Sequence, residues 1–256
     1  MFHYNLKIII KKFIQKILKK FGYRLHQTIN DEINQFTQED RKILNLYSKF
    51  TMTTDYRMSM LLKSFHHIKD NNIEGDFVEC GVWQGGNLMI LNHLNNLYNT
   101  SRNIYAFDTF QGMTEPTASD INHEGVKAKI NFDKLKNKEN FSNWSNCSID
   151  IVKNNFIKKN LNPNDIKFIQ GKVENTLLDV NNLPKKISIL RLDTDFYEST
   201  KIELEILYPL LSKNGVLIID DYGDWLGAKK AVDEYFTDTK TWLHFIDHGA
   251  RVHIKS

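Results

Sequence analysis

The stretch "ISILRLDTD", residues 187–195, is an apolar run that ends in two aspartates. A second run, "GVLIIDDYG" at residues 215–223, also leads into two aspartates. Short runs rich in Ile, Leu and Val are typical of buried strands, so each aspartate pair should mark the end of a strand. Four carboxylates at two strand ends must be hydrated, paired or bound to a cation, because an isolated charge is costly to bury.

The sequence on either side of these runs alternates apolar segments with helical patterns. The expected strands are 77–82, 104–107, 166–169, 187–192, 216–219, 243–246 and 252–254, and the expected helices are 86–97, 149–159, 198–211 and 225–235. Near-continuous apolar strands separated by helices are typical of a parallel sheet covered on both faces. The turn "DHGA" between the last two strands indicates one antiparallel strand. We therefore expect an α/β fold with a doubly wound, mostly parallel, seven-stranded Rossmann-like sheet, a C-terminal antiparallel strand and an N-terminal helical extension.

The length of 256 residues suits one α/β domain with an extension. We expect a basic helix at 1–30, a helical lead-in at 31–74 and the sheet domain at 75–256. Within the sheet domain, residues 112–146 are polar and lack clear periodicity. A connection of that length is usually functional. Because it follows the second strand, it should lie over the carboxyl edge of the sheet as a lid or substrate loop.

The N-terminal segment 1–30 carries seven Lys or Arg and no acidic residue. The whole chain has a net charge of +3, so the remaining residues sum to −4. Apolar residues recur at helical spacing with lysines on the other face, which predicts a basic amphipathic helix. Two interpretations stay open: the helix packs on its own domain or a second copy, or residues 7–21 lie on an anionic membrane surface.

The remaining composition is that of an ordinary soluble protein. Cys80 and Cys147 are the two cysteines of the sequence, too few for a disulfide framework or, without other ligands, a structural zinc site. The N-terminus lacks a secretory signal pattern, and no window approaches the roughly 18 apolar residues of a membrane span. We therefore expect a cytoplasmic protein, peripheral to the inner membrane face if its helix binds there, with no nucleic-acid partner.

The first expected strand leads into a glycine-rich turn in "DFVECGVWQGGNLMIL". Glu79 is followed by Gly81, Gly85 and Gly86, and glycines let a backbone approach a ligand closely. The spacing E-x-G-x-x-x-G-G differs from the dinucleotide fingerprint G-x-G-x-x-G. The second strand ends in "YAFDTF", which puts Asp108 where an acid can bond paired ribose hydroxyls. Together the two motifs favour S-adenosylmethionine over a dinucleotide.

The four aspartates at the strand ends are candidates for a metal site. Side chains two apart in a strand point the same way, so Asp193 and Asp195 should face one site if the strand stays extended. Clustered carboxylates raise one another's pKa values unless a cation intervenes, and oxygen-only ligands favour Mg²⁺. The alternative is that the acids are separately solvated or cap helices, as Asp195 and Asp221 could.

Four motifs in order resemble the macrocin O-methyltransferase (TylF-like) family: "GDFVECGVWQGGNLM", "YAFDTFQGM", "LRLDTDFYEST" and "GVLIIDDYGDWLGAKKAVDEYF". The resemblance runs from about residue 50 to the C-terminus, with residues 1–30 outside it and the long loop matching only at its edges. Members of this family have the class I methyltransferase fold and use S-adenosylmethionine and a divalent metal to methylate sugar hydroxyls. The resemblance also implies a homo-oligomer.

The resemblance assigns roles by position. The implied metal ligands are Asp193, Asp220 and Asp221, and the implied catalytic base is Asp195. The implied cofactor-binding residues are Glu79, Gly81, Gly85, Asp108, Thr109, Ser148 and Val173, of which the last two come from the adenine-pocket segments "CSIDIVKNNF" and "GKVENTL". The family often has tryptophan where Lys172 stands. Candidates for the sugar pocket are His123, Trp144, Tyr197, Tyr222 and Trp225, although such aromatic residues are often packing residues.

The resemblance implies an S-adenosylmethionine- and Mg²⁺-dependent O-methyltransferase that acts on a sugar hydroxyl of a glycoside or of a surface or lipid-linked glycan. A metal-dependent sugar-phosphate hydrolase would use the same carboxylates differently. A third interpretation is a non-catalytic, membrane-associated module of a glycan assembly system.

Overall fold

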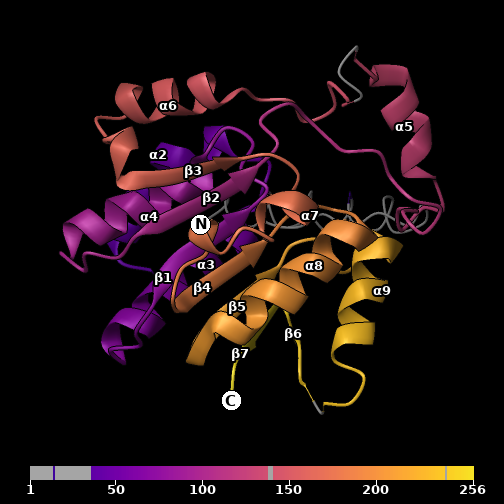
Figure 1. The fold of residues 1–256 in the computed structure, drawn as a ribbon. Coiled ribbons are helices and arrows are strands. Elements are labelled where there is room, and N and C mark those ends of the chain that lie inside the picture. Colours follow the sequence, from indigo (N-terminus) through magenta and orange to yellow (C-terminus); the bar gives the residue numbers. More distant parts are fainter. Residues whose placement is uncertain (1–13, 15–35, 138–140, 240) are drawn as a thin grey trace. The chain divides into compact units, whose positions relative to one another are not determined.

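The computed structural model describes residues 14, 36–137, 141–239 and 241–256 (Figure 1). The chain divides into two compact units, residues 1–41 and 42–256, and the second holds the whole sheet. The expected basic helix at 1–30, with its membrane contact at 7–21, lies outside the described residues except for Ile14 and stays a prediction. Among the described residues, no helix combines the length and apolar character needed to span a membrane.

A seven-stranded sheet forms the centre of the second unit, with the strand order β3-β2-β1-β4-β5-β7-β6. The strands are β1 (Asp76–Cys80), β2 (Ile104–Asp108), β3 (Ile166–Gln170), β4 (Ile187–Leu192), β5 (Leu211–Ile219), β6 (His244–Phe245) and β7 (Arg251–Ile254). The first five run parallel, and β7 is antiparallel to both β5 and β6. This confirms the predicted doubly wound sheet. The strand order reverses between β1 and β4, which is where such sheets bind ligands.

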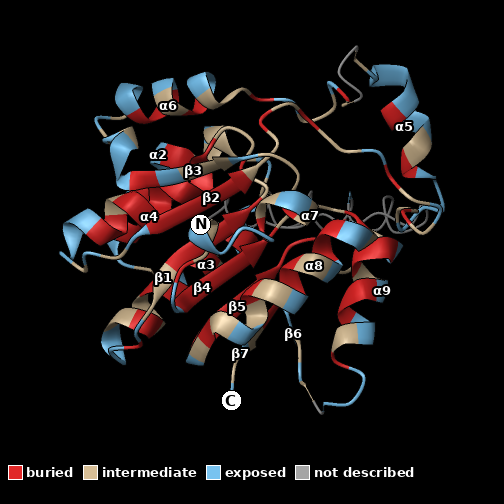
Figure 2. Cartoon of the chain, in the orientation of Figure 1, coloured by how far each residue is buried: buried red, intermediate tan, exposed pale blue. Residues whose placement is uncertain are grey.

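Helices such as α3 (Asp55–Asp70) and α8 (Tyr197–Leu207) cover the two faces of this sheet. The other helices are α2 (Gln38–Tyr47), α4 (Gly86–Leu97), α5 (Ala128–Leu135), α6 (Ile149–Lys158), α7 (Val173–Thr176) and α9 (Leu226–Tyr235). Val78 and Leu190 share an apolar core with Leu204 of α8. Alternate strand residues face the other way, and Phe77 accordingly meets Phe65 of α3 with ring centroids 5.8 Å apart. Figure 2 shows the central strands mostly buried, and β4 is buried along its whole length.

Several boundaries differ from those predicted. The first strand ends at Cys80, because Gly81 has a φ of +85° that turns the chain away. Helix α8 ends at Leu207, and Pro209 lies in a short 3-10 turn before β5 begins at Leu211. The last helical turn stops there because proline cannot donate the next hydrogen bond.

The insert at 112–146 is more ordered than its polar sequence indicated. It contains α5, and residues 138–140 lie outside the described part. Its base is fastened to the start of α9 by the Leu226 N–H, which donates to the Ile121 carbonyl at 2.8 Å. Asp120 is almost fully buried and accepts the Tyr197 N–H at 2.8 Å, so an insert carboxylate caps α8.

Gly81→Ala should destabilise the protein more than Gly125→Ala. Both glycines have a left-handed backbone, with φ of +85° and +83°, so each substitution carries about 1 kcal/mol of strain. A Cβ at Gly81 would also lie 1.9 Å from the Asp193 carbonyl oxygen, whereas one at Gly125 would meet nothing within 4 Å. We expect urea denaturation to show a free energy of unfolding about 2 kcal/mol lower for Gly81→Ala than for Gly125→Ala. Equal stabilities would contradict the close approach of the two strand ends.

Candidate active site

The turn after β1 and the end of β2 are held together by one carboxylate. Asp108 accepts the Val82 N–H at 2.6 Å and the Trp83 N–H at 3.3 Å through Oδ2, and the Phe110 N–H at 2.7 Å through Oδ1. Burial raises the pKa of Asp108, while these backbone N–H groups lower it. A carboxylate offers about four acceptor sites, so the two N–H groups on Oδ2 and the one on Oδ1 leave a site on Oδ1. The group can therefore organise the turn and still accept a hydroxyl from a ligand.

A cavity with about 690 Å³ of space unfilled by protein atoms lies beside this turn and is partly open to solvent. Of the residues predicted from the sequence, the cavity is lined by Gly81, Asp108, Thr109, Val173, Asp193 and Asp195. The cavity is also lined by Met113 and Glu174, which sequence reasoning missed although both lie inside the quoted motifs.

Three other predicted cofactor residues have different surroundings. Gly85 is the N-cap of α4, and a Cβ there would lie 2.9 Å from Val152 of α6. Ser148 caps α6, where its hydroxyl accepts the Ile151 N–H at 3.4 Å. Glu79 is buried and bonds to Arg191 at 2.7 Å.

A carboxylate cluster stands at the other side of the cavity. Asp193, Asp195 and Asp221 each offer an oxygen within 4.8 Å of the others. The strand does not stay extended, because β4 ends at Leu192 and Asp195 has a left-handed backbone with φ of +66°. The Asp195 N–H donates to Asp221 Oδ2 at 3.1 Å, which holds this uncommon conformation.

The environment of the cluster favours protonated carboxyls or a bound cation. Burial, together with repulsion by neighbouring carboxylates, raises the pKa of Asp193 to about 6 against the opposing effect of Arg191, and raises that of Asp195 to about 7. The pKa of Asp221 lies well above its ordinary value, again through burial first and repulsion by Asp195 second. A divalent cation would replace the shared protons and remove the repulsion.

Asp220 occupies a different position from its neighbour Asp221. Its Oδ1 accepts from Arg191 at 2.8 Å, and its Oδ2 accepts from Arg57 at 2.6 Å. Both of its oxygens are therefore engaged with buried guanidinium groups. The sequence predicted Asp193, Asp220 and Asp221 as metal ligands, whereas the structure brings Asp195 into the cluster and pairs Asp220 with arginines.

Arg191 is the centre of this buried charge network. Its guanidinium contacts Glu79 at 2.7 Å, Asp193 at 2.9 Å and Asp220 at 2.8 Å, and it donates to the Thr53 hydroxyl at 2.9 Å. Sequence reasoning assigned it no role. The signal was present, because an arginine inside an apolar strand must find carboxylate partners.

The predicted sugar-pocket residues fall into three groups. Trp144 and Trp225 lie together, with ring centroids 5.8 Å apart, and both contact the Phe196 ring. The hydroxyls of Tyr197 and Tyr222 instead bond to acids of α9, at 2.6 and 2.7 Å. His123 faces Asp224 and His248 rather than the tryptophans.

Comparison with known families matches residues 6–250 to the macrocin O-methyltransferase (TylF) family. The chain belongs to this family. Demethyldecarbamoylnovobiocin O-methyltransferase of Streptomyces niveus is 30% identical over 188 residues, which cover 72% of this chain and 67% of that protein. The solved structure of the O-methyltransferase NovP is 27% identical, with a TM-score of 0.70 over 81% of this chain and 82% of its own.

Further relatives agree with this assignment. An 8-demethyl-8-(2,3-dimethoxy-alpha-L-rhamnosyl)-tetracenomycin-C 4'-O-methyltransferase of Streptomyces olivaceus is 30% identical over 67% of this chain and 62% of its own length. The family match begins at residue 6, so the expectation that residues 1–30 lie outside the resemblance is wrong. The chain is therefore an S-adenosylmethionine-dependent O-methyltransferase. This assignment excludes the sugar-phosphate hydrolase and the non-catalytic module as its function.

Arg191→Met should destabilise this methyltransferase far more than Lys186→Met. Removing Arg191 leaves three carboxylates near the cavity without their shared counter-charge, a change that costs about 3–5 kcal/mol in buried pairs. Lys186 pairs with the exposed Glu74, and such surface pairs contribute about 0–1 kcal/mol. Urea denaturation of both variants measures the difference.

The deficit of Arg191→Met should shrink as the pH falls from about 8 to about 5. Burial raises the pKa of Asp193 to about 6 although Arg191 lowers it, so the folded state binds this proton more tightly than the unfolded chain. Loss of the arginine increases that preference, and stability then rises as the carboxyls take up protons. A deficit that does not change with pH would show that Arg191 acts through packing alone.

Proposed function

We propose that this chain transfers the methyl group of S-adenosylmethionine to a sugar hydroxyl of a glycosylated natural product or glycan, with the help of a divalent cation. The observation that carries the proposal is the position of the Asp193, Asp195 and Asp221 cluster. It borders the same cavity as the glycine turn and Asp108. The relative whose name specifies a rhamnosyl tetracenomycin supports a glycoside as the acceptor.

The cavity's lining fits the cofactor. Asp108, at the carboxyl end of β2, is the proposed acceptor for the ribose hydroxyls. Gly81 has no side chain to block the approach of a ligand to the turn. Val82 and Val173 supply apolar walls suited to an adenosine group.

The cluster's chemistry fits Mg²⁺ or a similar hard cation, because all three donors are carboxylates. Asp193, Asp195 and Asp221 are the residues proposed to hold it. When bound, such an ion polarises the accepting oxygen as a Lewis acid. Asp220 is proposed as a support that keeps Arg191 and Arg57 in place beneath the cluster.

The remaining steps belong to the chain's own residues. Asp195 lines the cavity, and the carboxylate oxygen that it does not give to the cation is proposed to accept the proton that the sugar hydroxyl loses. Arg191, 2.9 Å from Asp193, prevents that carboxylate from turning out of the cluster. The transfer removes a positive charge from sulfur, so no oxyanion hole is required. Trp144 and Trp225 are proposed to pack against the sugar.

The proposed function is tested by measuring methyl transfer to glycosides with a free sugar hydroxyl, with the matching aglycones as controls. We expect S-adenosylhomocysteine release with the glycosides only. Treatment with EDTA should abolish turnover, because the acceptor oxygen then lacks its Lewis acid. Added Mg²⁺ should restore turnover. Equal methylation of an aglycone, or full activity in EDTA, would contradict the proposal.

Asp221→Asn and Asp220→Asn should separate metal binding from folding. Burial and the neighbouring carboxylates raise the pKa of Asp221, so the neutral asparagine should leave the fold intact. Loss of a carboxylate ligand should lower Mg²⁺ affinity at least about tenfold. Asp220→Asn should instead lower the free energy of unfolding by about 3 kcal/mol, because two arginines lose their shared carboxylate.

Calorimetric Mg²⁺ titration and urea denaturation of both variants provide the measurements. If Asp220→Asn loses Mg²⁺ affinity as strongly as Asp221→Asn, the ligand set is the one that the sequence predicted.

A further inference from the structure

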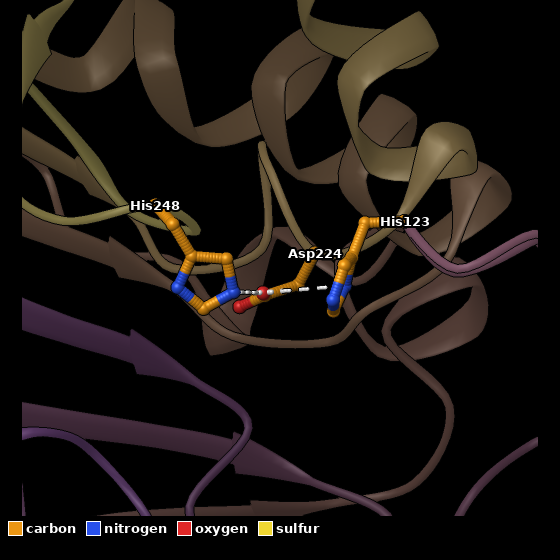
Figure 3. A group of neighbouring side chains, drawn as sticks. All are labelled: His123, Asp224 and His248. Atoms are coloured by element: carbon orange, nitrogen blue, oxygen red, sulfur yellow. Dashed lines mark ion pairs between the residues drawn. The ribbon is translucent and has the colours of Figure 1, made fainter. Parts of the chain in front are cut away.

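Two histidines and an aspartate from three separate segments meet outside the carboxylate cluster (Figure 3). His123 belongs to the insert, Asp224 follows β5, and His248 lies in the turn between β6 and β7. His248 Nε2 is 2.5 Å from Asp224 Oδ1, and His123 Nδ1 is 4.0 Å from the same oxygen. The two imidazole rings lie on either side of the carboxylate, with centroids 5.3 Å apart.

The Asp224 carboxylate is oriented by a buried arginine. Arg57 Nη2 donates to its Oδ2 at 2.9 Å, which leaves Oδ1 directed at the two imidazoles. Arg57 cannot follow a moving carboxylate, because it also binds Asp220 at 2.6 Å and Asp247 at 2.9 Å. Hydrogen bonds that orient a ligand in this way are typical of metal sites.

The backbone of all three segments is fixed as well. The His123 N–H donates to the Asp224 carbonyl at 2.9 Å, so the insert is tied to the loop beside it. The Gly223 N–H donates to the Gly249 carbonyl at 2.7 Å, and a Cβ on Gly223 would lie 1.8 Å from the His248 carbonyl oxygen. The three side chains therefore start from positions that the fold determines.

The donor chemistry differs from that of the carboxylate cluster. Two imidazole nitrogens and one carboxylate oxygen suit zinc and similar transition metals, whereas oxygen-only clusters suit Mg²⁺. Ligands about 2.0–2.1 Å from a tetrahedral ion lie roughly 3.4 Å from each other. The distances from Asp224 Oδ1 to the two imidazole nitrogens, 2.5 and 4.0 Å, lie on either side of that value. The His123 and His248 side chains are 49% and 65% exposed, so they can rotate to reach it.

The surrounding charge also favours a cation. Arg57 is the cation that bonds to Asp224, and it divides its charge among three carboxylates, those of Asp220, Asp224 and Asp247. The carboxylates in this network therefore outnumber its positive groups.

We propose that His123, Asp224 and His248 bind a zinc-type transition-metal ion that fastens the insert to the loops after β5 and β6. The ion joins His123 of the insert to the loop that begins with Asp221. It is separate from the Mg²⁺ proposed at the carboxylate cluster, and its solvent-facing side keeps coordination positions for water or an acceptor group.

The test is a calorimetric Zn²⁺ titration of the untagged full chain in excess Mg²⁺, which occupies the carboxylate cluster. We expect one equivalent to bind in the wild type, with affinity at least about tenfold lower in His123→Ala and in His248→Ala and no saturable binding in the double variant. His67→Ala is the matched control, because this histidine bonds to the distant Asn214 carbonyl at 3.0 Å and should leave Zn²⁺ affinity unchanged.

A second readout follows the fastening itself. Zn²⁺ should slow amide hydrogen exchange across residues 120–127 in the wild type and in His67→Ala, but not in the double variant. Retained Mg²⁺ binding by the double variant shows that it is folded. If the wild type binds no Zn²⁺ in excess Mg²⁺, or binds it as the double variant does, the group is an ion pair only and the proposal is wrong. A failure to bind S-adenosylmethionine would refute the proposed function without affecting this result.

Discussion

Arg191 is a cation buried inside the central strand of the sheet, and its neutralisation determines how the strand ends are arranged. It lies in β4 between β1 and β5, and its carboxylate partners come from β1 and from the residues that follow β4 and β5. Glu79 and Asp220 fill two of these positions and Asp193 the third. A buried charge is stable only when it is paired, and here the pairing also draws Asp193 to the edge of the cavity.

The same constraint divides the aspartate pair after β5 between two tasks. Asp220 turns toward Arg191 and Arg57, so its negative charge is paired with these two buried guanidinium groups. Asp221 points to Asp195 and joins the cluster. Arg57 extends the network to Asp224, whose other oxygen faces two histidines. One pair of buried guanidinium groups thus supports both the all-carboxylate cluster and the mixed histidine and carboxylate group.

Much of the fold could be predicted from the sequence, because apolar runs indicate buried strands and glycines mark the turns that follow them. The sheet and the grouping of acids at its edge follow from such local patterns. Local patterns do not show which of Asp220 and Asp221 joins the carboxylate cluster. That depends on Arg57, which binds Asp220 from a helix 163 residues away in the sequence. The left-handed backbone of Asp195 and the capping of α8 by Asp120 also depend on contacts between distant segments. Helix α5 was missed although Ala128, Phe132 and Leu135 fall at i, i+4 and i+7, because eight residues are too few for that spacing to stand out within a polar segment.

The central claim is that the arginine network sorts the acids, so that Asp193, Asp195 and Asp221 receive the cation. The most direct measurement is a crystal structure of the protein with S-adenosylhomocysteine and Mn²⁺, in which anomalous scattering locates the ion. The account predicts one strong peak bound by these three carboxylates, with Asp220 still paired to Arg191 and Arg57. A peak coordinated by Asp220 in place of Asp195, or no peak at this edge of the sheet, would contradict it.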